Sequence, residues 1–81
     1  MFTIIYFMKN NEIFIFTPYI TLGNLLKLTG KISFGGEAKF FLLENKVLVN
    51  NIIENRRGRK IYPNDIVNID KDYFFIKIRG E

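Results

Sequence analysis

The hydrophobic residues of this chain follow two different periods. Runs rich in Ile, Phe, Val and Tyr predict short β-strands, and they cover residues 12–17, 47–49, 52–53, 66–69 and 73–79. Between the first and second of these runs, two segments carry apolar residues at the spacing of a helix. The pattern therefore predicts a strand, two helices and then four or so short strands.

The first predicted helix begins after Thr21 and ends before Gly30. Threonine is a good N-cap residue, because its hydroxyl accepts a hydrogen bond from a free amide of the first turn. Leu22, Leu25 and Leu26 recur at helical spacing, and glycine is common just after a helix end. A helix this short must pack against another element to be stable.

The second predicted helix begins at Gly35 or Gly36 and ends near Asn45. Glu37 lies in its first turn, where a negative charge complements the helix dipole. The buried face is expected to consist of Ala38, Phe41 and Leu42.

Turn residues separate the strands of the second half, at Asn50-Asn51, Pro63-Asn64-Asp65 and Asp70-Lys71-Asp72. Glu54–Lys60 is too polar for a core, so we expect it to form an exposed loop or an irregular edge. In the final strand, Phe74, Ile76 and Ile78 alternate with Tyr73, Phe75, Lys77 and Arg79.

The first eleven residues allow two interpretations. Residues 1–8 are of β-type and Lys9-Asn10-Asn11 is turn-like, so this extension pairs with residues 12–17 as a hairpin if it is ordered. Alternatively Met8 is the natural start, and residues 1–7 are an extension that the fold does not need. We expect one domain over residues 12–81, a small α+β fold with two short helices packed on a mainly antiparallel sheet.

The composition excludes most catalytic arrangements. The 81-residue chain has no Cys and no His, which removes thiolate metal sites and every His-activated nucleophile. The acidic residues Glu54, Asp65, Asp70 and Asp72 lie at turns and strand ends rather than in a metal-binding loop. We therefore expect no enzyme, no cofactor and no metal. No segment reaches the roughly 18 apolar residues of a membrane span.

The positive charge of the chain is concentrated in its middle third. Residues 31–60 carry seven cations and three acids, an excess equal to the net charge of +4 of the whole chain. Such segregation is typical of a surface that binds a polyanion, although a basic face can also serve solubility alone.

Two segments in this region carry the residue types that bind phosphate. Ser33, Gly35, Gly36 and Lys39 lie where the second helix begins, and free amides there attract anions. The glycine pair alternatively allows close helix packing. Arg56, Arg57, Arg59 and Lys60 form a cluster whose charges repel one another unless an anion binds, which favours binding over an ordinary solvated loop.

Five motifs in order resemble the RNA-binding domain named after ribosomal protein S-four, also called the αL motif, and above all its small standalone YaaA-like branch. They lie at residues 20–27, 35–39, 47–50, 54–61 and 63–65, so the resemblance covers about residues 12–70. Asn51 and Asn64 stand where that family usually has glycine, and Asn is well suited to left-handed positions.

The resemblance implies a helix-turn-helix-like pair on a small sheet, bound to structured RNA that is usually ribosomal. It implies phosphate contacts by Gly35, Gly36 and Lys39, and a basic loop of Arg56, Arg57, Arg59 and Lys60. Lys27 and Lys31 match the basic edge of the first helix and the connector.

We therefore expect a cytoplasmic, monomeric, non-catalytic protein that binds structured RNA, with ribosomal RNA of the large subunit favoured. The alternative is a protein-interaction subunit of a ribosomal, replication or repair assembly. In that alternative the basic loop holds acidic side chains, and Tyr73–Arg79 is an exposed edge to which a partner adds a strand. For Tyr73 and Phe75 there are two interpretations. They cover the core or a partner surface, or they stack on RNA bases.

Overall fold

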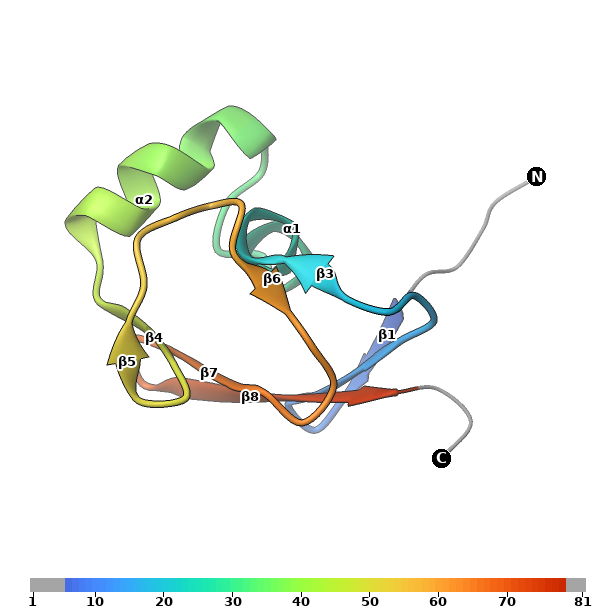
Figure 1. The fold of residues 1–81 in the computed structure, drawn as a ribbon. Coiled ribbons are helices and arrows are strands. Elements are labelled where there is room, and N and C mark those ends of the chain that lie inside the picture. Colours follow the sequence, from blue (N-terminus) through green and yellow to red (C-terminus); the bar gives the residue numbers. More distant parts are fainter. Residues whose placement is uncertain (1–5, 79–81) are drawn as a thin grey trace.

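The computed structural model describes residues 6–78, and it contains two sheets and two helices (Figure 1). The strands and helices are β1 (Tyr6–Lys9), β2 (Glu12–Ile15), β3 (Ile20–Thr21), α1 (Leu22–Leu28), α2 (Ala38–Glu44), β4 (Val47–Val49), β5 (Ile52–Ile53), β6 (Lys60–Ile61), β7 (Ile66–Ile69) and β8 (Asp72–Ile78). A single 3₁₀ turn, Gly35–Glu37, leads into α2.

The larger sheet has six strands in the order β1-β2-β8-β7-β4-β5. All its neighbouring strands are antiparallel except β2 and β8, which run parallel and join opposite ends of the chain. β3 and β6 form a separate two-stranded ribbon. Figure 1 shows both helices and this ribbon on the same side of the larger sheet. The predicted α+β class, with two short helices on a mainly antiparallel sheet, is confirmed.

The core lies between the helices and this face of the sheet. Leu22, Leu25 and Leu26 of α1 are fully buried, as the helical spacing predicts. They meet a layer of strand residues that are also fully or almost fully buried, among them Ile13, Ile15, Val47, Val49, Ile61, Val67, Ile69 and Ile76. Phe41 of α2 packs against this cluster from its edge.

Side chains hold the backbone at the start of α1 and ahead of the 3₁₀ turn that leads into α2. The Thr21 hydroxyl accepts a hydrogen bond from the Asn24 amide at 3.2 Å, so the predicted N-cap is confirmed. Before α2, Glu37 Oε1 accepts from the amides of Ser33 and Phe34, each at 2.8 Å. These bonds, first that from Phe34 and then that from Ser33, hold the pKa of the Glu37 carboxyl below its usual range.

The predicted turns are confirmed by their backbone angles. Asn50 and Asn51 have φ values of 52° and 69°, and Asn64 has 78°. Asparagine accepts this left-handed conformation more readily than other side chains, so it serves at positions that often need glycine. Gly30 after α1 has φ of 78°, as expected of a helix-ending glycine.

The N-terminal hairpin is present in the described part of the chain. β1 pairs with β2 from Tyr6↔Ile15 to Lys9↔Glu12, so residues 6–9 belong to the sheet. Residues 1–5 of the predicted extension, and Arg79 of the predicted final strand, lie outside the described residues.

The expectation that the last strand is an exposed edge is wrong. β8 lies between β7, which pairs with its first half, and β2, which pairs with its second half. The edge strands among the described residues are β1 and β5. Tyr73 and Phe75 are exposed while Phe74 and Ile76 are buried, so those two aromatics lie on the sheet face away from the helices and do not cover the core.

Replacing Leu25 by alanine is expected to lower the free energy of unfolding by about 2–5 kcal/mol, because it removes a fully buried side chain and leaves a cavity. Leu43→Ala on α2 is the matched control, since Leu43 is 69% exposed and its truncation should change stability little. Urea unfolding followed by circular dichroism measures both variants. Equal losses in the two variants would contradict the described core.

Candidate nucleic-acid interface

The loop of residues 54–60 is attached to the first turn of α1 through its backbone. The Leu22 amide donates to the Arg59 carbonyl and the Gly23 amide to the Arg57 carbonyl, both at 2.8 Å. The first amides of a helix have no partner within the helix. Here the loop supplies the acceptors, so the position of each basic residue is set relative to α1.

Gly23 allows this close approach. A Cβ atom at residue 23 would lie 3.3 Å from the Arg57 carbonyl oxygen and 3.6 Å from Arg57 Cβ. The first distance is tighter than most Cβ contacts and the second is ordinary packing, so a side chain here would require the loop and helix to separate by a few tenths of an ångström. Sequence reasoning did not assign Gly23 a role, although an unusual glycine in the first turn of a leucine-rich helix was a usable signal.

Glu54 is buried at the base of the loop, which corrects the prediction that the whole of Glu54–Lys60 is exposed. Only 6% of Glu54 is accessible to solvent. Its carboxylate accepts hydrogen bonds from the Arg56 amide (3.0 Å), Arg56 Nε (2.9 Å), Arg56 Nη2 (3.0 Å) and Arg59 Nη1 (2.7 Å). A carboxylate tolerates burial when its charge is compensated in this way.

This network lowers the pKa of Glu54 from 4.5 to about 2, because the hydrogen bonds from Arg56 favour the charged form and the one from Arg59 adds to them, against the opposing effect of burial. It also changes the interpretation of the basic cluster. Part of the repulsion among the cations is relieved by an anion within the protein. Among the described residues, the Arg57 side chain makes no hydrogen bond or ion pair, so its guanidinium is available to a ligand.

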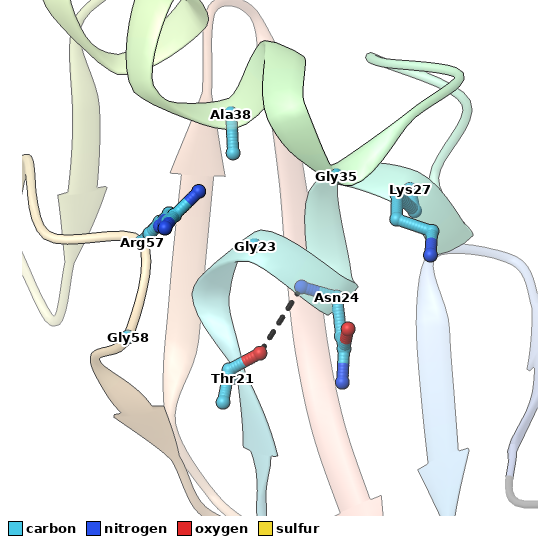
Figure 2. Close-up of a pocket in the computed structure, with 8 residues that line it drawn as sticks. All are labelled: Thr21, Gly23, Asn24, Lys27, Gly35, Ala38, Arg57 and Gly58. Atoms are coloured by element: carbon cyan, nitrogen blue, oxygen red, sulfur yellow. Dashed lines mark hydrogen bonds between the residues drawn. The ribbon is translucent and has the colours of Figure 1, made fainter.

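A hollow of about 280 Å³ lies between α1, the start of α2 and the loop. We call it the α1 hollow; its lining residues are Thr21, Gly23, Asn24, Lys27, Gly35, Ala38, Arg57 and Gly58. In the view of Figure 2, Arg57 and Lys27 lie on opposite sides of Gly23. Three predicted site residues from three separate segments, Lys27, Gly35 and Arg57, are thus brought together.

A second hollow, of about 430 Å³, shares Gly58 with the α1 hollow. We call it the tyrosine hollow; it is lined by Arg56, Gly58, Arg59, Lys60 and Tyr62. Lys60 Nζ lies 5.0 Å from the centre of the Tyr19 ring, and the Tyr19 and Tyr62 rings are 5.6 Å apart. The three remaining cations of the predicted basic loop therefore meet here. Sequence reasoning did not include either tyrosine in the site.

The other predicted site residues do not join these hollows. Lys31 forms an ion pair with Asp72 of β8 at 2.7 Å and lines a separate hollow with Glu37 and Phe40. The Ser33 amide is already bonded to Glu37. Gly36 and Lys39 are exposed but line neither hollow.

The glycine pair is not needed for helix packing. A Cβ atom added at Gly35 or Gly36 would meet nothing within 4 Å, so close packing within the described residues does not explain either glycine. Open space at Gly35 continues the α1 hollow.

No helix among the described residues is long and apolar enough to span a membrane.

Comparison with known proteins identifies a family and a relative that this chain resembles in sequence. The family model described as S4 domain matches residues 13–77. A protein of Bacillus subtilis (strain 168) described as "Probable ribosome maturation protein RlbA" is 55% identical over 60 residues, which cover 74% of this chain and 84% of that protein. No solved structure gives a significant match.

Glu54→Gln is expected to cost about 1–3 kcal/mol of stability near neutral pH, because a buried charged hydrogen-bond acceptor for two guanidinium groups becomes neutral. The folded-state pKa of Glu54 lies below its usual value of 4.5, so its contribution is complete above about pH 5 and is lost as the pH falls toward about 2.

Denaturant unfolding at several pH values tests this expectation. The stability difference between wild type and Glu54→Gln should shrink steadily below about pH 5. Glu44→Gln, at an exposed position on α2, is the control and should stay close to wild type throughout. A difference that does not depend on pH would rule out the charge of Glu54 as the source of stability.

Proposed function

This chain belongs to the S4 domain family, and we propose that it is a non-catalytic protein that binds structured ribosomal RNA. The observation that carries the proposal is the basic loop, whose backbone is bonded to α1 and whose cations line two hollows that share Gly58. Phosphate groups of RNA are the anions that such a surface fits.

Lys27 and Arg57 of the α1 hollow make the first set of phosphate contacts in this proposal, with the open backbone at Gly35 allowing close approach. Arg56, Arg59 and Lys60 make the second set. Arginine is suited to this role because its planar guanidinium binds phosphate through two donors. Contacts to phosphate fix position, while the shape of the RNA supplies selectivity. Ser33, Lys31, Gly36 and Lys39 then lie at the margin of the interface.

The process we propose is ribosome maturation in the cytoplasm, with the large subunit as the particle bound. The Bacillus subtilis relative, described as a probable ribosome maturation protein, supports the process, and the gradient experiment below tests the choice of subunit. We propose a monomer without a cofactor. The absence of His and Cys from the whole sequence supports a function without catalysis, since it removes the commonest general base and the commonest nucleophile pairs.

The alternative of a protein-docking subunit loses its main structural argument. Strand addition requires an open strand edge, and β8 lies inside the sheet. The edges that remain open among the described residues are those of β1 and β5, not that of the final strand on which this alternative was built.

Arg57→Ala is expected to weaken RNA binding at least tenfold and to leave the melting temperature nearly unchanged, because the Arg57 side chain has no partner among the described residues. If five or six phosphates are neutralised, log K falls with log salt at a slope of roughly −4 to −5, and loss of one contact reduces that slope by about 1. Filter binding over a salt series measures both quantities.

Lys71→Ala, in the exposed β7–β8 turn, is the control for nonspecific loss of charge. Equal effects of Arg57→Ala and Lys71→Ala would argue that only net charge matters. Arg56→Ala is unsuitable as the test, because it also removes hydrogen bonds from the buried Glu54.

A tagged copy of the protein is expected to co-migrate with the large ribosomal subunit or its precursor in a low-salt sucrose gradient. An Arg57→Ala copy, or a gradient at raised salt, should move the protein to the top fractions, since the proposed contacts are electrostatic. Co-migration with the small subunit would correct the particle. Wild-type protein found only at the top of the gradient would contradict ribosome binding.

A further inference from the structure

The tyrosine hollow differs from the α1 hollow in one respect that bears on its ligand. Both are cationic, but of the two only the tyrosine hollow has an aromatic side chain in its lining, that of Tyr62. We propose that this hollow binds one unpaired nucleotide of the RNA, with its base against Tyr62 and its phosphate between Arg56 and Lys60. The inference rests on the proposed RNA-binding function and adds to it the kind of RNA feature that is recognised.

The backbone of Tyr62 is fixed by hydrogen bonds, and its ring has a packing partner. Its amide donates to Asp65 Oδ2 at 2.8 Å, and its carbonyl accepts from the Asp65 amide at 3.0 Å. The preceding residue, Ile61, is fully buried in β6. The Tyr62 ring also packs against the Tyr19 ring at an angle of 49°. A ring held in this way loses little conformational entropy when a base stacks on it.

The packing around Tyr62 leaves ring surface for a ligand. Tyr62 is 47% exposed, so the contact with Tyr19 and the neighbouring turn uses only part of its surface. Aromatic rings with a free face are the usual platforms for unstacked RNA bases, and the stacking does not require a particular base.

The cations of the hollow are also held in place before a ligand arrives. Glu54 binds Arg56 through Nε and Nη2, and Arg59 through Nη1. The Arg56 side chain is nevertheless 71% exposed, and Lys60 is exposed beside Tyr19. A phosphate at this position therefore meets oriented donors next to an aromatic face, which are the two chemical features of a nucleotide.

A nucleotide within an RNA duplex cannot contact the aromatic ring and the cations of the tyrosine hollow together. The bases of an RNA duplex are stacked on one another, and their faces cannot reach a side chain. A duplex would therefore engage the cations alone, and the α1 hollow already offers such a surface in Lys27 and Arg57. A bulged or single-stranded nucleotide presents both its base face and its phosphate. The two hollows thus divide backbone contacts from base contacts.

The absence of tryptophan from the sequence allows a direct test. Tyr62→Trp creates a single tryptophan at the proposed stacking position. Tyr73→Trp is the matched control, because it places a tryptophan at an exposed position on the sheet face away from the helices. The probes are a short RNA hairpin with one bulged uridine and the same hairpin fully paired. We expect the bulged hairpin to quench the Tyr62→Trp fluorescence, the paired hairpin to quench it much less, and neither to quench Tyr73→Trp.

Affinities of the two hairpins give the second readout. Wild type and Tyr62→Phe should prefer the bulged hairpin by about fivefold or more, the size of one base–aromatic stack. Tyr62→Leu, which keeps apolar volume without an aromatic face, should bind both hairpins as wild type binds the paired one. Thermal unfolding of each variant by circular dichroism confirms that the fold is retained.

The outcomes separate this inference from the proposed function. Equal binding of both hairpins by wild type, with binding still weakened by Arg57→Ala, would overturn the nucleotide site and leave RNA binding intact. A bulge preference that persists in Tyr62→Leu would overturn the role of Tyr62. Failure of wild type to bind either hairpin at low salt would contradict the proposed RNA-binding function, and the inference would fall with it.

Discussion

The attachment of residues 54–60 to the first turn of α1 is the contact on which the whole candidate interface depends. Two backbone hydrogen bonds, from Leu22 and Gly23 to the loop carbonyls, fix it. They place Arg57 and Gly58 beside Gly23 and Lys27, which closes the α1 hollow on the loop side. Gly23 favours this approach, because a Cβ atom there would lie only 3.3 Å from the Arg57 carbonyl oxygen. The contact joins parts of the chain that are far apart in sequence.

The Glu54 carboxylate lowers the electrostatic cost of gathering several cations in one loop. One carboxylate accepts from Arg56 and Arg59, which reduces the repulsion among neighbouring cations and orients both guanidinium groups. The same carboxylate cannot neutralise all the cations, so the loop keeps a positive excess around Arg57 and Lys60. The loop is thus organised before it meets an anion, and a ligand that binds it has less side-chain ordering to supply.

The sequence predicts the local features well and the long-range ones poorly. The Thr21 cap, the helix end at Gly30 and the left-handed turn at Asn50-Asn51 each follow from the chemistry of a few adjacent residues. Burial of Glu54 was not predictable from polarity. A glutamate among arginines is expected at the surface, unless it is known to form hydrogen bonds with those arginines. The parallel β2–β8 pairing and the two-residue strands β3 and β6 depend on contacts between distant segments. The family resemblance pointed to the basic loop but not to Gly23 or Tyr62.

The two hollows give the proposed interface two energetic components with different dependence on solution conditions. Contacts of Lys27 and Arg57 with phosphate weaken as salt rises, because they depend on counterion release. Stacking on Tyr62 depends on an apolar contact and is much less sensitive to salt. Long-range attraction then brings the RNA to the loop without regard to sequence, while the short-range contact retains RNA that offers an unpaired base beside a suitably placed backbone. A small domain with a single basic loop can in this way select a structural feature of RNA without reading its sequence.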